Sequence, residues 1–115
     1  MPLPMTRHSN PLHLDFCGVP MDSPIVLLSG CVGFGEEYTR VEGFSNRDVG
    51  AVVLKGTTGE ARLGNPPHRV FETPMGMLNA IGLQNPGVDT VVDDILPGLD
   101  FEETRFIANV CGSTI

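Results

Sequence analysis

The stretch from Gly50 to Thr58, Gly-Ala-Val-Val-Leu-Lys-Gly-Thr-Thr, decides how this sequence folds. Its residues Ala51 to Leu54 are all apolar, which is typical of a strand that is buried on both faces of a parallel sheet. The apolar run begins after a glycine and stops at Lys55, so the strand is short and a polar loop follows it. Such a strand indicates an α/β protein, in which helices cover the faces of the sheet.

Two similar runs lie on either side of this strand in the sequence. Residues 25–28 form a continuous apolar run, again typical of a strand buried on both faces, and residues 105–110 form a third strand. Helices are expected at 36–44, where acidic residues open the segment, and at 88–96, where apolar residues share one face. With a small hairpin expected over residues 12–23, this order predicts parallel β-α-β units.

The region between residues 59 and 85 is rich in glycine, proline and asparagine and has few helix signals. A connection of this length inside a compact domain is usually functional, so we expect short hairpins there rather than disorder. Burial is expected for its large apolar side chains, which are Met75, Met77, Leu78, Ile81 and Leu83.

The composition limits the classes of function. The 115 residues have a formal net charge of −7 and only seven scattered Lys and Arg residues, which argues against a nucleic-acid partner. No apolar run approaches the ~18 residues of a membrane span, and the start lacks the pattern of a secretory signal, so a cytoplasmic protein is expected. Three cysteines at irregular spacing predict free thiols rather than a disulfide framework or a local metal site.

The predicted elements do not complete a domain. A β/α barrel needs eight strands and about 250 residues, whereas three parallel strands leave a large unpaired edge. We therefore expect a loosely packed lead-in over residues 1–11, and over residues 12–115 a partial β/α barrel whose further strands lie beyond the C-terminus.

Polar or small residues follow all three strands, at Ser29-Gly30, at Lys55-Gly56 and at Asn109. The loops after the strands of a β/α barrel build the active site at one face, so these groups are expected to lie together. Lys55 would be partly desolvated there and could hold a negative charge, or its amine could extend to solvent. Asn109, an amide in an apolar strand, is either a ligand contact or a satisfied polar group of the core.

Glycines 30, 33 and 35 would let a ligand approach the backbone closely, or they simply make a turn. Their spacing is not a dinucleotide fingerprint, because Tyr38 stands where the third glycine of that motif would be. The loop from Asn79 to Gly87 combines amides, apolar residues and glycines. Its backbone N–H groups could hold a carboxylate, and the plain alternative is an ordinary hairpin turn.

Several strings resemble class 1 dihydroorotate dehydrogenases, in the same order and spacing over about residues 12–113. They are Ser29-Gly30-Cys31-Val32-Gly33-Phe34-Gly35, Lys55-Gly56-Thr57-Thr58, Gly64-Asn65-Pro66 with Arg69, the run from Glu72 to Gly87, and Ile107-Ala108-Asn109-Val110 with Gly112-Ser113. The part of that run from Asn79 to Gly87 is similar to the NAD-linked class 1B branch rather than to class 1A or the membrane-associated class 2. The resemblance is to the N-terminal portion of a class 1B catalytic subunit.

This resemblance implies an FMN-binding (β/α)8 barrel of the TIM type that oxidises (S)-dihydroorotate to orotate in pyrimidine biosynthesis. It also implies an electron-transfer partner subunit with FAD and a 2Fe-2S cluster, a heterotetramer, and NAD as the acceptor. The positions that match FMN contacts are Ser29, Gly30, Lys55, Gly56 and Asn109. The positions that match substrate contacts are Lys55, Asn79, Ala80, Ile81, Gly82 and Leu83.

The catalytic base of class 1 enzymes is a cysteine on a later loop, and none of Cys17, Cys31 and Cys111 occupies its motif. Cys111 stands where a small residue such as alanine is usual. The base is therefore expected beyond Ile115, and the 115-residue piece alone is expected to lack turnover. Two alternatives stay open: a non-catalytic remnant that binds flavin, a pyrimidine or a partner chain, and a pyrimidine-reducing enzyme with a similar barrel.

Overall fold

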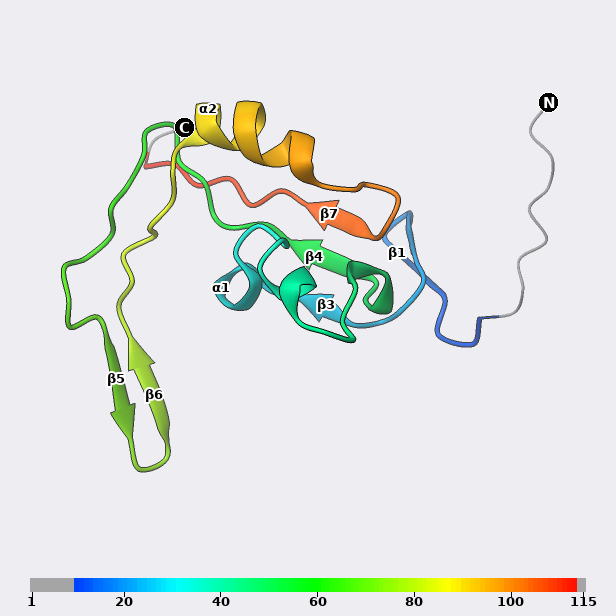
Figure 1. The fold of residues 1–115 in the computed structure, drawn as a ribbon, viewed down its shortest axis with the longest axis horizontal. Helices are drawn as coiled ribbons and strands as arrows, with labels where there is room; N and C mark the ends of the chain where they lie inside the picture. The colour runs from blue at the N-terminus through cyan, green and yellow to red at the C-terminus, as the bar shows by residue number, and fades with distance from the viewer. Residues whose placement is uncertain (1–9, 114–115) are drawn as a thin grey trace.

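The computed structural model describes residues 10–113, and the part of the expected lead-in at residues 1–9 lies outside it. Two antiparallel hairpins flank a parallel sheet of three strands (Figure 1). The hairpins pair β1 (Leu14–Phe16) with β2 (Val19–Met21), and β5 (Val70–Thr73) with β6 (Gly76–Asn79). The first hairpin confirms the prediction over residues 12–23, and the second confirms that the long connection folds into a hairpin.

The central sheet consists of β3 (Val26–Leu27), β4 (Ala51–Val53) and β7 (Arg105–Ile107) in the order β3-β4-β7. All neighbours are parallel, with Leu27 beside Val52 and Val52 beside Phe106. The predicted parallel arrangement is therefore confirmed, with β4, which contains the apolar run from Ala51, in the middle.

The helical segments are short. They are α1 (Ser29–Val32), the 3-10 turns η1 (Tyr38–Arg40) and η2 (Asn46–Asp48), and a continuous run of α2 (Val88–Thr90), the π-helical η3 (Val91–Ile95) and the 3-10 turn η4 (Leu96–Gly98). That run confirms the helix expected at 88–96. The helix expected at 36–44 is wrong, since only η1 forms there. Val41 is already extended (φ −83°, ψ 124°), and residues 37–43 are exposed, so no apolar face stabilises a longer helix.

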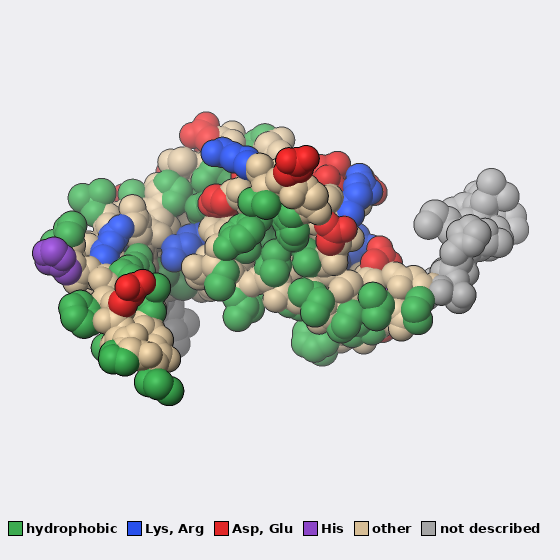
Figure 2. Space-filling model, turned by 60° about the horizontal axis from the view of Figure 1, so that its bottom comes forward, with side chains coloured by type: hydrophobic (Ala, Val, Ile, Leu, Met, Phe, Trp, Pro, Cys, Tyr) green, Lys and Arg blue, Asp and Glu red, His purple; other side chains and the backbone are tan. Residues whose placement is uncertain are grey.

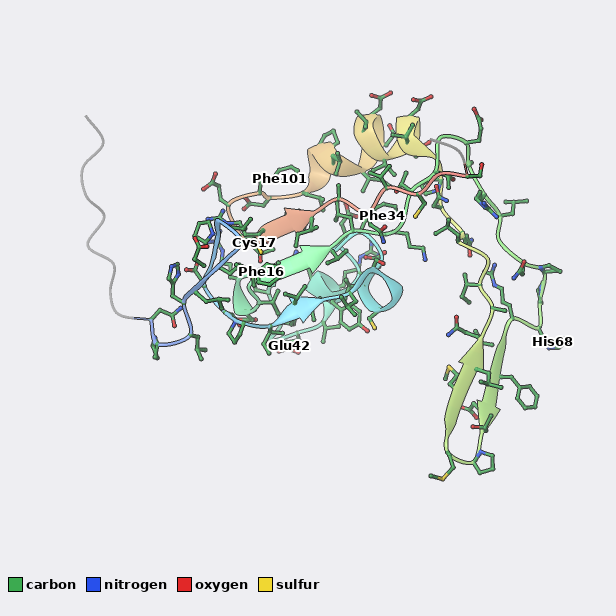
Figure 3. All side chains as sticks on the ribbon, turned by 180° about the vertical axis from the view of Figure 1, so that it is seen from behind. Phe16, Cys17, Phe34, Glu42, His68 and Phe101 are labelled. Atoms are coloured by element: carbon green, nitrogen blue, oxygen red, sulfur yellow. The ribbon has the colours of Figure 1, made fainter. Side chains whose placement is uncertain are left out.

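The core lies on one face of the sheet, under the helical segments. Its buried members are Val32, Val49, Val52, Leu54 and Leu99, and five half-buried side chains, Leu27, Phe34, Phe44, Leu96 and Phe106, pack against them. Phe101, labelled in Figure 3, meets Phe106 edge to face at a ring separation of 5.4 Å. Thr104 donates a hydrogen bond from its hydroxyl to Val49 O at 2.9 Å. This bond joins the segments that lead into β7 and β4.

The expectation that residues 25–28 form a strand buried on both faces is wrong. Ile25 and Leu28 are more than half exposed, at 54% and 62%. The cause is position in the sheet: β3 is an edge strand, and only β4 has a strand on each side. On the face opposite the core, Ala51 is buried and Arg105 donates to Pro20 O of the first hairpin at 2.9 Å, whereas Leu28 and Ile107 further along the strands are exposed.

The expected burial of apolar residues in the long connection is also wrong for three of the five. The hairpin β5–β6 projects away from the sheet, and Figure 2 shows hydrophobic side chains over it. Met75, Met77 and Leu78 are exposed, whereas Ile81 and Leu83 are half-buried because the chain returns to the sheet there. None of the helices within the described residues is long and apolar enough to cross a membrane.

Candidate functional site

The three parallel strands end on the same side of the sheet, where the following loops gather (Figure 1). α1 begins at Ser29, with one residue between it and the end of β3, Lys55 and Gly56 follow β4, and Asn109 follows β7. Because the strands are parallel, the residues that follow them lie at one edge of the sheet, as the sequence predicted.

The pairing of β4 with β7 shifts by one residue at this edge. Val53 lies beside Ile107, but Thr57, four residues on, bridges Val110, which is only three residues on. The extra residue lies within 54–56, the segment that contains the lysine. A bulge of this kind bends the strand and redirects its side chains, and bulges are frequent next to active sites.

Gly56 is the point of closest approach in this bulge. A Cβ atom at Gly56 would lie 2.9 Å from Leu83 Cδ1, 3.2 Å from Cys111 Sγ and 3.4 Å from Asn109 Nδ2. The absence of a side chain thus lets the exit of β4, the exit of β7 and the 79–83 loop meet. Thr57 holds the two exits together, since its N–H donates to Asn109 O and its carbonyl accepts from Cys111 N–H, each at 2.9 Å.

A cavity of about 360 Å³ opens beside this contact. The residues that line it come from the loop after β4, the 79–83 loop and the segment after β7, and they are Thr58, Gly59, Glu60, Arg62, Leu83, Cys111, Gly112 and Ser113. Its wall combines glycines, one cation (Arg62), one carboxylate (Glu60) and an apolar side chain (Leu83), a mixture of polar and apolar groups that suits a small molecule.

Asn65 and Arg69 hold the 79–83 loop, Asn65 by direct bonds and Arg69 through its carbonyl, which accepts from Ala80 N–H at 2.8 Å. Asn65 donates from Nδ2 to Ala80 O at 2.7 Å and from its backbone N–H to Ile81 O at 2.8 Å. Arg69 holds the carbonyls of Leu63 and Asn65 with one guanidinium nitrogen, each at 3.2 Å, and the Gln84 side chain with another at 2.6 Å. The loop is therefore built into the structure and is not a free turn.

Asn79 lies apart from the cavity at the strand ends. It closes β6, its side chain is exposed, and it belongs to a separate hollow of about 170 Å³ with Arg69, Leu78 and other hairpin residues. His68, which also lines this hollow, is labelled on the outer side of the hairpin in Figure 3. Of the five expected substrate-loop residues, the structure brings Leu83 to Gly56 and Asn109, but not Asn79.

The remaining expected residues differ in their surroundings. Lys55 is half-buried, and within residues 10–113 no hydrogen bond or ion pair engages its ammonium group. Ser29 is half-buried in the first turn of α1, where its carbonyl accepts from Gly33 N–H at 3.1 Å. Gly30 is exposed with open space around it, so nothing nearby requires a glycine there.

Comparison with known proteins adds the family. A model of the dihydroorotate dehydrogenase family matches residues 11–115. The chain belongs to the dihydroorotate dehydrogenase family. It is 50% identical over 106 residues to a protein of Bacillus caldolyticus and 52% identical over 106 residues to one of Anoxybacillus flavithermus, both named dihydroorotate dehydrogenase B (NAD(+)), catalytic subunit. Each match covers 92% of this chain and 33% of the relative, so the chain spans about a third of their length.

The resemblance to class 1B dihydroorotate dehydrogenases inferred from the motifs is confirmed by these matches. Sequence reasoning missed Asn85, which is buried at the site, and the cavity-lining residues Thr58 and Arg62. A signal was present for Asn85, because asparagine before Pro-Gly marks a turn whose side chain can bond to the backbone. Nothing in the sequence pattern distinguished Arg62 from an ordinary exposed arginine.

The residues at the strand ends fit a flat, polar-edged cofactor such as a flavin. Gly56 lets the two strand exits and Leu83 come together, and the Asn109 amide lies beside both exits. Lys55 offers a cation that no partner engages within residues 10–113. Such groups can contact a ring edge by hydrogen bonds and complement negative charge on it.

Proposed function

We propose that the protein, working in the cytoplasm, oxidises dihydroorotate to orotate in pyrimidine biosynthesis. The observation that carries this proposal is the meeting of Gly56, Asn109 and Leu83 beside Lys55, in a chain about half identical to dihydroorotate dehydrogenase B catalytic subunits. The names of those relatives include NAD(+) and the term catalytic subunit, and that term implies that they work with a separate partner subunit. For this protein we propose an electron-transfer partner with FAD and a 2Fe-2S cluster, in a heterotetramer, with NAD as the final acceptor.

FMN is the proposed cofactor, and Ser29, Gly30, Lys55, Gly56 and Asn109 are the residues proposed to hold it. When bound, FMN supplies the acceptor for the hydride that dihydroorotate loses. Lys55 provides a positive charge at the carboxyl ends of the strands, where negative charge would otherwise be unfavourable. Gly56 contributes through its lack of a side chain, which lets Leu83 and Asn109 approach the exit of β4.

The substrate is proposed to contact Lys55 and the segment from Asn79 to Leu83. Leu83 supports this because its side chain lines the cavity next to Gly56. The carbonyls of Ala80 and Ile81 accept from Asn65, and the Ala80 N–H donates to Arg69 O at 2.8 Å. The N–H groups proposed to bind a carboxylate are therefore those of residues 81–83, for which no acceptor is found within residues 10–113. We place the general base, which removes a proton from the substrate, outside residues 1–115, and we propose that these residues alone have no turnover.

We also propose that the three-stranded sheet is part of a TIM-type (β/α)8 barrel. One face of the sheet packs under the helical segments, while Leu28 and Ile107 on the other face are 62% and 37% exposed. In such a barrel this second face is the interior, filled by side chains from all the strands.

Ile107→Lys tests the barrel. In the protein expressed from its complete reading frame, the lysine would be forced into a packed interior and should lower Tm by several degrees, since burying an unpaired charge costs several kcal/mol. Met75→Lys is the matched control, because Met75 is 96% exposed at the hairpin turn. Equal Tm values for the two variants in thermal unfolding would exclude a covered face.

The visible spectrum of the protein from its complete reading frame tests the function. We expect a flavin spectrum that bleaches when dihydroorotate is added without oxygen. A colourless protein would contradict the FMN site, and a flavin that responds to dihydrouracil but not to dihydroorotate would contradict the substrate.

A further inference from the structure

We propose that Asn85 is a positioning residue that holds Leu83, and with it the 79–83 loop, against the exit of β4. The proposal rests on the proposed function, because it assigns Asn85 a role in binding the pyrimidine substrate. Asn85 touches neither dihydroorotate nor flavin in this role and acts through Leu83.

The Asn85 side chain uses all of its hydrogen-bonding capacity to join Thr58, after β4, to the residues on either side of it in its own loop, Leu83 and Gly87. It is 5% exposed, and its Oδ1 accepts from Thr58 N–H at 3.1 Å and Gly87 N–H at 3.0 Å. Its Nδ2 donates to Leu83 O at 2.9 Å and to Thr58 Oγ1 at 3.0 Å. Only a side-chain amide offers two acceptor and two donor positions at once, so neither aspartate nor serine can reproduce the set.

The hydrogen bond to Leu83 O is important because the backbone of Leu83 has an unfavourable conformation. Leu83 has φ +56°, the left-handed region that residues with a Cβ rarely adopt. Such a conformation persists only where its surroundings over-determine it. The Asn85 amide supplies that constraint at the Leu83 carbonyl, while the Asn85 backbone pairs in both directions with Arg62, at 2.8 and 3.0 Å.

The conformation of Leu83 in turn sets the geometry of the site. Its Cδ1 atom lies 2.9 Å from where a Cβ of Gly56 would be. The same asparagine accepts a hydrogen bond from the backbone N–H of Thr58, which lies three residues after Lys55. Asn85 therefore fixes the position of the 79–83 loop relative to the segment that carries Lys55.

Asn85→Asp tests this role, because the carboxylate keeps the acceptor but loses the donor to Leu83 O. In the complete, flavin-loaded protein we expect the Kd for orotate, read from the flavin spectrum, and the KM for dihydroorotate to rise about tenfold, with kcat changing less than KM. The matched control is Asn46→Asp, since Asn46 is equally buried (4% exposed) and its Nδ2 donates to Gly35 O at 3.0 Å, away from the cavity. Asn46→Asp should leave both constants within about twofold.

A double variant checks that the effect passes through Leu83. Glycine adopts positive φ without cost, so in a Leu83→Gly background the further change Asn85→Asp should weaken orotate binding much less than it does alone. An unchanged Kd in Asn85→Asp, or an equal loss in Asn46→Asp, would overturn the proposal.

Amide hydrogen exchange separates this inference from the proposed function, because it needs no ligand. Exchange over residues 81–87 should become faster in Asn85→Asp, and in Asn85→Ser if the aspartate variant does not fold, but not in Asn46→Asp. If the parent protein ignores orotate while this exchange result holds, the proposed function fails and the positioning role in the loop stands. Unchanged exchange overturns the positioning role itself.

Discussion

Replacing Lys55 by methionine will slow the reduction of bound flavin by dihydroorotate by about 10²- to 10³-fold, the usual effect of removing one charge-stabilising donor from an active site. Methionine keeps much of the apolar stem and removes the ammonium group. Because no hydrogen bond or ion pair within residues 10–113 engages that group, its loss should leave thermal stability nearly unchanged. Anaerobic stopped-flow absorbance of the protein from its complete reading frame measures the rate.

Lys55→Arg is the control for this experiment. It keeps the positive charge but changes its shape, so we expect an intermediate rate that exceeds that of the methionine variant. A methionine variant that reduces its flavin at the parent rate would remove Lys55 from the proposed site. A methionine variant with a much lower Tm would instead give the lysine a structural role.

Gly50→Ala will destabilise the protein by about 3 kcal/mol or more, at the upper end of what overpacking costs. A Cβ at Gly50 would collide with the carbonyl oxygen of Ser23 and come within 2.8 Å of Met21 Cε. The obstacle is mainly backbone and cannot rotate away. The same glycine donates its N–H to Ile25 O at 2.9 Å, so a shift would also disturb the start of the β3–β4 pairing.

Gly76→Ala is the matched control, because nothing lies within 4 Å of the position of its Cβ. This substitution should be neutral or stabilise by up to about 1 kcal/mol through the unfolded state. Urea unfolding of both variants, followed by circular dichroism, supplies the comparison. Similar midpoints for the two alanine variants would contradict the close packing at Gly50.

The parallel sheet was predictable because its signal is local. Ala51 to Leu54 is a short apolar run that ends abruptly at a lysine, and the segments at 25–28 and 105–110 repeat the pattern. The edge exposure of Ile25 and Leu28 was not predictable, because apolar runs look alike in central and edge strands. The failed helix at 36–44 has a related cause: its acidic start suggested a helix, but helix stability depends on a packed face that the sequence does not reveal.

The candidate site was predictable to the extent that it follows strand ends. Lys55, Gly56 and Asn109 follow β4 and β7 within two or three residues, and parallel pairing brings strand ends to one edge. Asn79 and Leu83 looked equivalent as members of one loop, yet the structure places only Leu83 at that edge. The difference arises where the projecting hairpin returns to the sheet, which no local pattern encodes.

The sequence by itself determined the family, the parallel order of the strands and the residue types that follow them, because short-range patterns and motif strings carry this information. Tertiary structure alone decided the one-residue shift between β4 and β7, the close contact over Gly56, the left-handed Leu83 and the full engagement of Asn85. Each of these depends on atoms that are distant in the chain and meet only when the backbone has closed around them. Their geometry is set by packing and by the need to satisfy buried polar groups, and no single segment specifies either.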